Sequence, residues 1–373
     1  MMRHLGAPVR LERPLAGVVV LELIRAKVER GERILVDEAV WLHEHADDAA
    51  LRELSAKVRA RFSPPDQATY LIMAIVNTTN VCVAKCDYCA FYVLPKQPGG
   101  YLLTVDELKA RVDKLLGFGG TVVGFNGGFN PDVRLEEFEV IFRELRQSYG
   151  DRLEFYGLTI AEFMYACKVS KVPYLEGARR MKASGLRWIT GGGAEVLADA
   201  FRKRHSPLKY RVDDFYDAQR AVIEAGVGST ATMVIGFDET LDERMEHLSR
   251  LRTFQDSVGG ALTSFLCWTY KPYHTSLGGK ELDTQAYLRW LAISRIFLDN
   301  IAHIRTSVLT KNADALIGLA YGADDFDLPT EDEVTEKAGA TISLDFERLL
   351  DAARVQGFTP IHREPWPVRG ATA

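Results

Sequence analysis

The sequence lacks any apolar run long enough to cross a membrane. Its longer apolar stretches, such as Leu15 to Leu21 and Tyr70 to Val76, are much shorter than the roughly 18 residues that a membrane-spanning helix needs. The first residues also lack the pattern of a secretory signal peptide, in which a charged segment precedes an apolar segment and a small-residue cleavage site. We therefore expect a cytoplasmic protein with no membrane partner.

The sequence also lacks an excess of positive charge. It has 46 lysines and arginines against 51 aspartates and glutamates, which gives a formal net charge of −5. No block of basic residues is dense enough to follow a phosphate backbone. We therefore expect no nucleic acid partner.

Cysteine is scarce, with five residues in a chain of 373. This low and odd number argues against a framework of disulfides. Three of the five, Cys82, Cys86 and Cys89, nevertheless lie close together in the sequence. Such a group favours metal or redox chemistry.

The remaining composition is that of an ordinary folded protein. Hydrophobic residues make up 47% of the chain, charged residues 26% and aromatic residues 10%, so a sizeable core is available. A disordered, collagen-like or low-complexity chain is excluded. Length alone does not decide between two domains and one large α/β barrel.

The first part of the chain has the pattern of a helical layer. From Gly17 to about Phe62 the sequence is rich in Leu, Ala, Glu and Arg, with apolar residues at helical spacing. The run Ser63-Pro64-Pro65 ends this pattern. We expect residues 1–65 to form a helical extension that packs on the domain that follows.

Residues 66–342 alternate between short apolar runs and longer amphipathic segments, which is the pattern of successive β-then-α units. The expected strands are Tyr70–Val76, Thr121–Phe125, Leu153–Leu158, Leu186–Ile189, Ser229–Ile235, Leu262–Tyr270, His303–Leu309 and a short one near Gly322–Phe326. The expected helices are Val105–Leu116, Leu135–Tyr149, Leu175–Ser184, Val212–Ala225, Leu241–Ser257, Thr284–Asn300 and Ala313–Tyr321. About eight such units predict a TIM-like (β/α) barrel with its active site at the carboxyl ends of the strands. An open doubly wound sheet is the alternative that this pattern leaves open.

Residues 343–373 are expected to add a C-terminal extension. Phe346, Leu349 and Leu350 follow Ser343 at helical spacing and indicate one more helix. The tail from Thr359 to Ala373 contains prolines, and we expect it to be irregular, or disordered at its end.

The three clustered cysteines follow directly on the first predicted strand, where a barrel places its chemistry. Four thiolates complete a structural zinc site or an ordinary four-iron cluster, and no fourth cysteine or histidine stands nearby. Three ligands on four irons would leave one iron open to bind a substrate. The alternatives are a zinc site completed by Cys167 or Cys267, and three buried structural cysteines.

Two glycine-rich runs also end predicted strands. Gly127-Gly128 would let the backbone approach a ligand closely, although a tight turn has the same composition. Gly191-Gly192-Gly193 is followed by Glu195, whose carboxylate suits a sugar hydroxyl, and by Arg202 and Arg204, which suit a carboxylate ligand. The alternatives are charge stabilisation of a helix N-terminus for Glu195 and a solvent-exposed face for the arginines.

The cysteine motif resembles that of the radical SAM superfamily, which Cys82, Cys86, Tyr88 and Cys89 match. The resemblance implies that the three cysteines hold a 4Fe-4S cluster and that S-adenosylmethionine (SAM) is a second cofactor. It also implies reductive cleavage of SAM to a 5′-deoxyadenosyl radical, and a low-potential electron donor such as flavodoxin or ferredoxin. In this superfamily the aromatic residue before the third cysteine, here Tyr88, lies against the SAM adenine.

The same resemblance implies a function for the two glycine runs. Gly127-Gly128 resembles the glycine motif whose backbone receives the methionyl amino group of SAM. The glutamate that usually follows is replaced by Phe129, so only the backbone role is carried over. In this context we expect Glu195, Arg202 and Arg204 to bind SAM as well.

Within the superfamily, nearly the whole chain resembles the enzymes of the futalosine route to menaquinone. The segments that carry this resemblance are residues 77–82, 89–95, 191–195, 231–233, 268–272 and 277–279. The stretch Phe91-Tyr92-Val93-Leu94-Pro95 and the pair Trp268-Thr269 favour the dehypoxanthine futalosine cyclases over the aminofutalosine synthases. The resemblance implies an enzyme whose radical abstracts a ribose hydrogen, after which the carbon radical closes onto the aromatic ring of dehypoxanthine futalosine.

The sequence departs from this family where substrate contacts are expected. The departures are Asn130, Gly157-Leu158-Thr159, Phe237, Tyr273-His274 and residues 325–331. They leave open a paralogue that acts on a different small molecule, for example in secondary metabolism. A non-enzymatic protein in which a metal cluster only pins the barrel is a further alternative.

Five residues are candidates for substrate binding or catalysis: Asn77, Asp238, Trp268, Tyr273 and His274. They lie at or after the ends of predicted strands, where polar and aromatic substrate contacts belong. His274 could move protons, and the aromatic residues could form the wall of a pocket. Helix capping for Asp238, a structural role for His274 and core packing for the aromatic residues are the alternatives.

Overall fold

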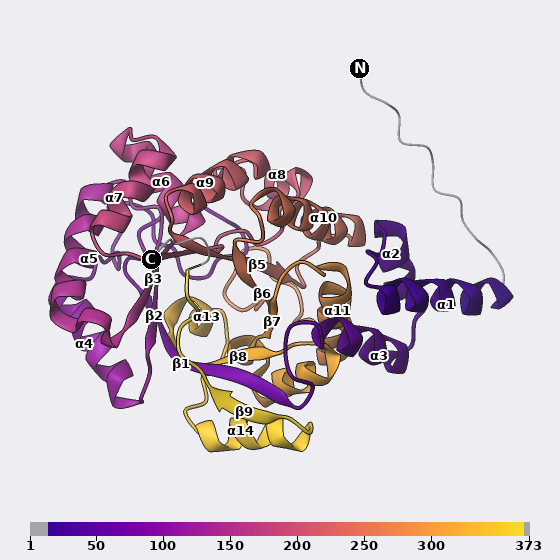
Figure 1. The fold of residues 1–373 in the computed structure, drawn as a ribbon. Coiled ribbons are helices and arrows are strands. Elements are labelled where there is room, and N and C mark those ends of the chain that lie inside the picture. The colour runs from indigo at the N-terminus through magenta and orange to yellow at the C-terminus, as the bar shows by residue number, and fades with distance from the viewer. Residues whose placement is uncertain (1–13, 369–373) are drawn as a thin grey trace.

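Eight parallel strands close into a barrel in the computed structural model, which describes residues 14–368 (Figure 1). The strands are β1 (Gln67–Asn77), β2 (Val122–Asn126), β3 (Glu154–Thr159), β4 (Trp188–Thr190), β5 (Gly228–Ile235), β6 (Leu262–Thr269), β7 (His303–Thr306) and β8 (Asp325–Asp332). Each strand pairs with the next, and β1 pairs with both β2 and β8, which closes the ring. The predicted barrel is therefore confirmed, and the open doubly wound sheet is wrong.

Helices surround the barrel (Figure 1), and most of them bury apolar residues in the main core. They are α4 (Val105–Gly117), α5 (Leu135–Tyr149), α6 (Ile160–Ser170), α7 (Tyr174–Ala183), α8 (Asp199–His205), α9 (Val212–Glu224), α10 (Leu241–Ser257), α11 (Thr284–Phe297), α12 (Val308–Lys311) and α13 (Glu333–Lys337), with short 3-10 helices η1 (Gly150–Arg152) and η2 (Asn312–Tyr321). On α4, for example, Leu108, Val112 and Leu115 are buried, and Thr104 and Glu107 form a capping box at the start.

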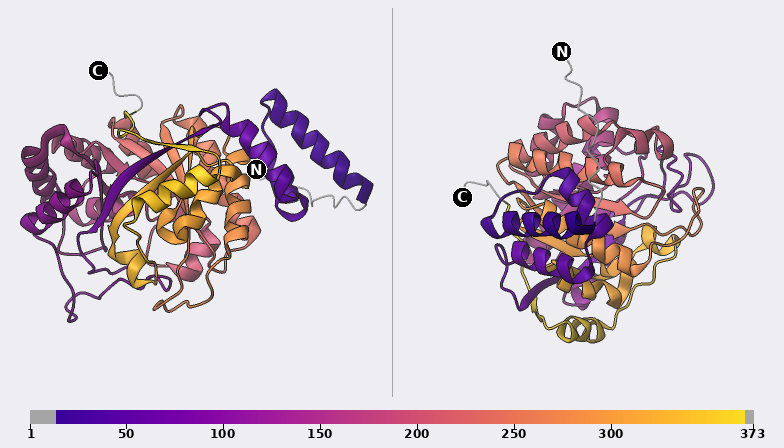
Figure 2. Two further views of the ribbon diagram at one scale, coloured as in Figure 1. Left: turned by 90° about the horizontal axis from the view of Figure 1, so that it is seen from below. Right: turned by 90° about the vertical axis from the view of Figure 1, so that its right-hand side faces the viewer.

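Three helices form the N-terminal layer that the sequence predicts. They are α1 (Pro14–Arg30), α2 (Val36–His45) and α3 (Asp48–Arg59), and they lie at one side of the barrel (Figure 2). Leu42, Leu51 and Leu54 are fully buried in the main core, and Arg289 of α11 forms an ion pair with Asp48 at 2.7 Å. The layer is thus joined to the barrel by apolar packing and by charge.

The C-terminal part covers the end of the barrel at which the strands begin. Helix α14 (Phe346–Val355) is followed by strand β9 (Thr359–His362), which pairs with β1 outside the ring. Trp366 packs against the strand residues at the amino end of the barrel, and its ring lies over the guanidinium of Arg363 at 3.3 Å. The prediction of a wholly irregular tail is wrong for β9, and residues 369–373 lie outside the described residues.

Four helices, α6, α8, α12 and α13, were not predicted from the sequence, and Val308 and Leu309, which were expected to end the seventh strand, begin α12 instead. Helix α6 is buried on most sides, since Ile160, Phe163, Met164 and Cys167 all lie in the core, so it lacks the alternation of apolar and polar faces. Helix α8 has seven residues, which is too short for a clear periodicity.

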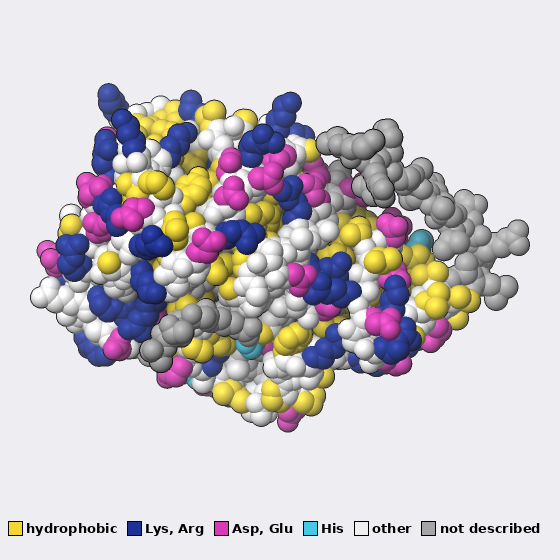
Figure 3. All heavy atoms as spheres, turned by 45° about the horizontal axis from the view of Figure 1, so that its top comes forward, with side chains coloured by type: hydrophobic (Ala, Val, Ile, Leu, Met, Phe, Trp, Pro, Cys, Tyr) yellow, Lys and Arg dark blue, Asp and Glu magenta, His cyan; other side chains and the backbone are white. Residues whose placement is uncertain are grey.

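No helix within residues 14–368 is long and apolar enough to cross a membrane. On the face shown in Figure 3, lysines and arginines are interspersed with aspartates and glutamates.

Candidate functional site

The cysteine loop follows β1 at the carboxyl end of the barrel, where the long connecting loops gather (Figure 2). Its backbone is held by hydrogen bonds to neighbouring loops: Cys82 donates its N–H to the Val93 carbonyl at 3.0 Å, and Val83 donates to the Phe129 carbonyl at 3.1 Å. Because the loop is fixed from both sides, the three thiols have defined positions.

The three thiols lie at an apolar wall. Cys86 packs with Ala84, Phe129 and Ala161, and Cys82 and Cys89 lie at the edge of the same cluster. Burial raises the pKa of the Cys86 thiol to about 11 and also raises the pKa of Cys89. These thiols are therefore protonated at neutral pH unless a metal takes the place of the protons.

The donor set fits a 4Fe-4S cluster better than a single metal ion. Among the described residues, no group of three or more His, Cys, Asp or Glu side chains is placed to hold one ion. Cys167 is buried in α6, with its sulfur against Gly177 of α7, and Cys267 is buried in β6. The zinc alternative completed by either residue finds no support. Three soft sulfur donors on one loop suit an iron–sulfur cluster.

The paired glycines approach this loop more closely than any other residue type could. A Cβ at Gly128 would lie 2.8 Å from the Cβ of Cys82, and a Cβ at Gly127 would lie 3.2 Å from a carboxylate oxygen of Glu162. The N–H of Gly128 is bonded to the Thr79 carbonyl at 2.8 Å. The two glycines therefore serve close packing of the β2 loop against the cysteine loop.

Glu162 is a site residue that the sequence analysis missed. It begins α6 in a capping box with Thr159, and burial raises its pKa to about 7. The Thr159-x-x-Glu162 spacing is a signal for a helix start and contains no sign that this carboxylate lies beside the paired glycines.

A cavity of about 250 Å³ opens at the mouth of the barrel. Four of the residues predicted from the sequence line it together: Tyr88, Cys89, Glu195 and Trp268 are among the lining residues. The ring of Tyr88 packs on Phe201 and Phe237, with centroid distances of 6.4 and 5.2 Å. The cysteine loop thus borders the same cavity as the glycine-rich loop after β4.

Glu195 lies in a buried group of charges. Lys209 donates to its carboxylate at 3.1 Å, and the Arg202 guanidinium is 4.0 Å away. Burial lowers the pKa of Lys209, but the charge of Glu195 and its other neighbours more than offset this, so the pKa of Lys209 is well above its usual value. Lys209 was not predicted, because its contact with Glu195 depends on how the loop after α8 folds back.

Arg202 is held by two backbone carbonyls. Its Nε donates to Tyr210 at 3.1 Å and its Nη1 to Ala194 at 2.9 Å. Its Nη2 is buried and has no partner among the described residues. A buried donor without a partner is costly. Arg202 lines a hollow beside the barrel mouth and not the cavity itself, so its predicted contact with SAM stays a prediction.

Arg204 and Asp238 lie away from the cavity lining. Arg204 pairs with Glu243 at 2.6 Å and with Asp238 at 3.3 Å. His205 lies between two carboxylates, with Nε2 2.7 Å from Asp238 and Nδ1 3.0 Å from Asp87 of the cysteine loop. Asp238 is thus linked to the cysteine loop through His205.

The remaining candidates are spread around the mouth. Asn77 is buried, its Nδ2 lacks a partner among the described residues, and its Oδ1 accepts from the Val334 N–H at 3.2 Å. Tyr273 is 53% exposed and lies against Gly339, and His274 is exposed with a φ of 61°. Neither lines the cavity, so their roles stay predictions.

A smaller cavity of about 60 Å³ continues into the barrel. Its lining includes Tyr156, Ser264 and Arg305, none of which was predicted. The hydroxyls of Tyr156 and Ser264 are buried without a partner in the described part of the chain. Strand periodicity places such residues inside a barrel but does not tell which of them reach a ligand.

Asp332, at the end of β8, is a further buried carboxyl in the lining of the larger cavity. One oxygen accepts from the hydroxyl of Thr335, and Oδ1 has no partner among the described residues. Burial raises its pKa to about 7. A carboxyl with this pKa is suited to accept a proton near neutral pH.

Comparison with known families divides the chain into two matched regions. The radical SAM superfamily model matches residues 76–251, and the model of the CofH/MqnC C-terminal region matches residues 260–366. The cysteine loop, the paired glycines and Glu195 lie in the first region, and Trp268 and Asp332 lie in the second.

Individual proteins match over most of their length. The cyclic dehypoxanthine futalosine synthase of Streptomyces coelicolor is 36% identical, over 92% of this chain and 87% of that protein. That of Halalkalibacterium halodurans is 32% identical, over 91% and 92%. The crystal structure of methylornithine synthase superposes with a TM-score of 0.69 at 15% identity, over 91% and 97%, which shows a shared fold.

Proposed function

The chain belongs to the radical SAM superfamily, in the branch with the CofH/MqnC C-terminal region, and on this premise we propose that it cyclises dehypoxanthine futalosine in menaquinone biosynthesis. The observation that carries the proposal is the three-cysteine loop at the edge of the cavity in the barrel mouth. The two futalosine synthases that match nearly the whole chain support the choice of substrate.

Cys82, Cys86 and Cys89 would hold the 4Fe-4S cluster. When it is bound there, the cluster supplies the electron that divides SAM into methionine and a 5′-deoxyadenosyl radical. The chain contributes the geometry: Gly127 and Gly128 keep side chains away from the loop, and the apolar wall of Phe129 and Ala161 keeps water from the thiols.

SAM would lie along the mouth of the barrel. Tyr88 offers an aromatic face to the adenine, and Glu195 offers acceptor oxygens to the ribose hydroxyls. The free Nη2 of Arg202, with Lys209 beside it, offers positive charge to the methionyl carboxylate. Arg204 would act through its ion pair with Asp238 rather than by contact.

The substrate would occupy the inner part of the cavity. Trp268 lines both cavities and offers a face for an aromatic ring, and the free hydroxyls of Tyr156 and Ser264 offer hydrogen bonds to polar groups. Closure of the radical onto the ring leaves one proton and one electron to be lost, and the electron would pass to the oxidised form of a one-electron carrier such as flavodoxin or ferredoxin. Asp332 is the residue placed to accept the proton.

The electron that starts each turnover would come from a low-potential carrier such as flavodoxin or ferredoxin. The protein would work in the cytoplasm.

The proposal is tested by anaerobic reconstitution with iron and sulfide, followed by addition of SAM, dithionite and dehypoxanthine futalosine. We expect 5′-deoxyadenosine together with a product two hydrogens lighter than the substrate, both followed by mass spectrometry. The variants Cys82→Ala, Cys86→Ala and Cys89→Ala should each abolish both products. Formation of 5′-deoxyadenosine with intact substrate would overturn the assignment of the substrate, and turnover by all three variants would overturn the cysteine-centred mechanism.

A further inference from the structure

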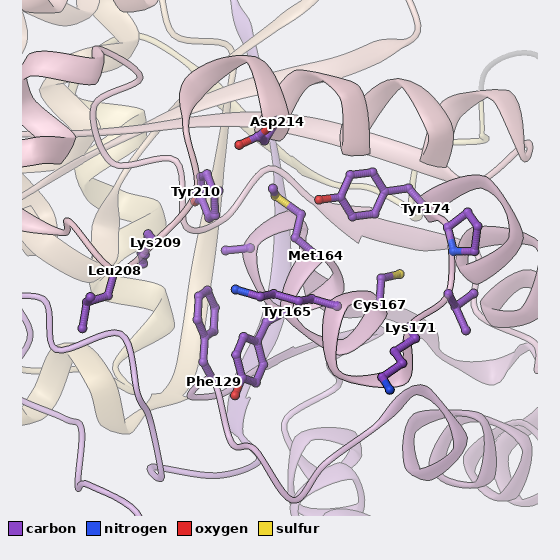
Figure 4. A pocket seen from close by; sticks show the side chains of 14 residues that line it. Phe129, Met164, Tyr165, Cys167, Lys171, Tyr174, Leu208, Lys209, Tyr210 and Asp214 are labelled. Carbon is purple, nitrogen blue, oxygen red and sulfur yellow. The ribbon is translucent and has the colours of Figure 1, made fainter.

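A groove of about 690 Å³ lies on the outside of the barrel, beside the cysteine loop (Figure 4). Helix α6, the start of α7, the loop before α9 and Phe129 form its walls. Figure 4 shows Phe129 and Tyr165 close together at one end and Tyr174 at the other. The groove is larger than the cavity in the barrel mouth, and most of its lining has no part in the reaction proposed above, which uses only Lys209, Phe129 and Ala161 from it.

The groove and the thiols share a wall. Phe129 and Ala161 line the groove, and both also pack in the apolar cluster that contains Cys86, with Cys82 and Cys89 at its edge. The rings of Phe129 and Tyr165 are stacked, with centroids 4.8 Å apart and planes at 11°. The groove is therefore an outer surface that reaches the cysteine loop without passing through the barrel mouth.

The rim of the groove carries free positive charge. Lys168 and Lys171 are exposed and form no ion pair within the described residues, whereas Lys209 is held by Glu195. The one acidic lining residue, Asp214, accepts a hydrogen bond from the Arg211 N–H at the start of α9. An adjoining hollow shares Lys209 and adds Lys203.

The same rim offers apolar surface. Leu208 is 60% exposed, and Tyr165 and Tyr174 are only partly buried. An aromatic and aliphatic centre surrounded by charges is the usual anatomy of a transient protein interface. The unpaired lysines Lys168 and Lys171 at this rim favour a partner whose surface is acidic.

We propose that this groove is the docking site of a small acidic protein that carries one low-potential electron. The inference rests on the proposed function, because reductive cleavage of SAM needs one electron from outside for each event. In the docked complex the carrier is oxidised by one electron and the cofactor bound to the cysteine loop is reduced by one. No covalent bond forms or breaks in this step. Phe129 and Tyr165 form the packed path between the two proteins.

The first test compares two reductants. The variant Lys168→Glu/Lys171→Glu reverses the rim charge, and Arg143→Glu/Arg348→Glu makes the same change of charge at exposed positions on α5 and α14. With reduced flavodoxin at low salt, we expect 5′-deoxyadenosine formation by the rim variant to fall about tenfold or more. With dithionite, which needs no docking site, its rate should equal that of the unchanged protein. The control variant should keep both rates.

The second test detects docking by cross-linking and does not depend on turnover. A carbodiimide couples lysines to carboxylates that they contact, so flavodoxin should become linked to Lys168, Lys171 or Lys203, and high salt should suppress the links. Links between two copies of this chain at these lysines, or flavodoxin links only elsewhere, would overturn the proposal.

The two tests also separate this inference from the proposed function. An equal loss of rate with both reductants would show that the lysines act on the SAM site, and no loss with either would place docking elsewhere. Failure of the unchanged protein to cyclise its substrate with dithionite would count against the proposed function and leave the mapped links to decide the docking site.

Discussion

Asp332 shows how a single buried carboxyl can link the pH of the solution to two properties of the protein. It is almost fully buried, lines the cavity and keeps one oxygen free among the described residues. Burial raises its pKa to about 7, whereas in the unfolded chain the value is near 3.8. Its charge state therefore changes within the working range of the enzyme.

We expect cyclisation to depend on ionised Asp332. Because only the carboxylate accepts a proton, product formation should rise with pH through about 7. In Asp332→Asn the rate of formation of the cyclised product should fall about a hundredfold or more, and it should no longer rise with pH through about 7. The variant should still form 5′-deoxyadenosine. Parallel assays of both compounds between pH 6 and pH 8, roughly one unit either side of the pKa, measure this. An Asn variant with the same rate and profile as the unchanged protein would exclude Asp332 as the acceptor.

The same residue affects stability in the opposite direction. A carboxyl whose pKa is raised by folding binds its proton more tightly in the folded state, so its contribution is present at low pH and is lost as pH rises through about 7. Compared with Asp332→Asn, the unchanged protein should therefore lose melting temperature as the pH rises from about 4 to about 7. This comparison cancels the titration of Glu162, which burial also raises to about 7.

At the scale of elements, His205 joins three segments that are distant in the sequence. It ends α8, bonds to Asp87 between two of the cysteines, and bonds to Asp238 after β5. Its carbonyl also accepts from the Asp87 N–H at 3.2 Å. The part of the cysteine loop between Cys86 and Cys89 is thus fixed by one histidine.

We expect His205→Ala to loosen the cysteine loop without unfolding the barrel. Loss of the ring leaves two carboxylates facing a gap, so the loop should exchange its amide hydrogens faster over residues 82–89 and release iron to a chelator several-fold faster. His303→Ala is the matched control, because His303 pairs with Asp324 at 2.7 Å in the opposite end of the barrel. Equal rates of iron release for the His205 variant and the control would show that the imidazole does not position the loop.

The elements differ in how much of their structure could be predicted. The strands were predicted well because β-branched and aromatic runs are what a closed parallel sheet buries on both faces. Helix α6 was missed because its burial removes the polar face, and β9 was missed because a short edge strand depends on pairing with β1. The end of β8 was expected near Phe326, but the strand continues to Asp332.

The site residues also differ in whether the sequence could predict them. Cys82, Cys86, Cys89 and Tyr88 could be found because their spacing along one loop determines their function. Lys209 and Asp332 could not, since Lys209 reaches Glu195 only because the loop after α8 folds back, and Asp332 lines the cavity together with residues from distant parts of the chain. The local spacing of residues in the sequence does not predict such contacts.

At the scale of the whole molecule, the core and the cysteine loop are separate structures. The large apolar core links the N-terminal helices, the barrel and α14 and contains none of the three clustered cysteines. These belong to a small cluster of their own at the barrel mouth. The tail with Trp366 closes the other end of the barrel and packs on the strand residues there. The fold therefore draws most of its stability from parts that do not include the three clustered cysteines.

We therefore expect the barrel to survive removal of its metal. Chelation under anaerobic conditions should abolish SAM cleavage and leave the far-ultraviolet circular dichroism unchanged. The melting temperature should fall by only a few degrees, because about 350 ordered residues bury a core that is stable without a metal. Small metal-dependent domains behave differently, since their binding free energy is their folding free energy. If the protein unfolds as it loses iron, the barrel depends on the cluster for its stability. That result would indicate a structural metal site and would contradict this prediction.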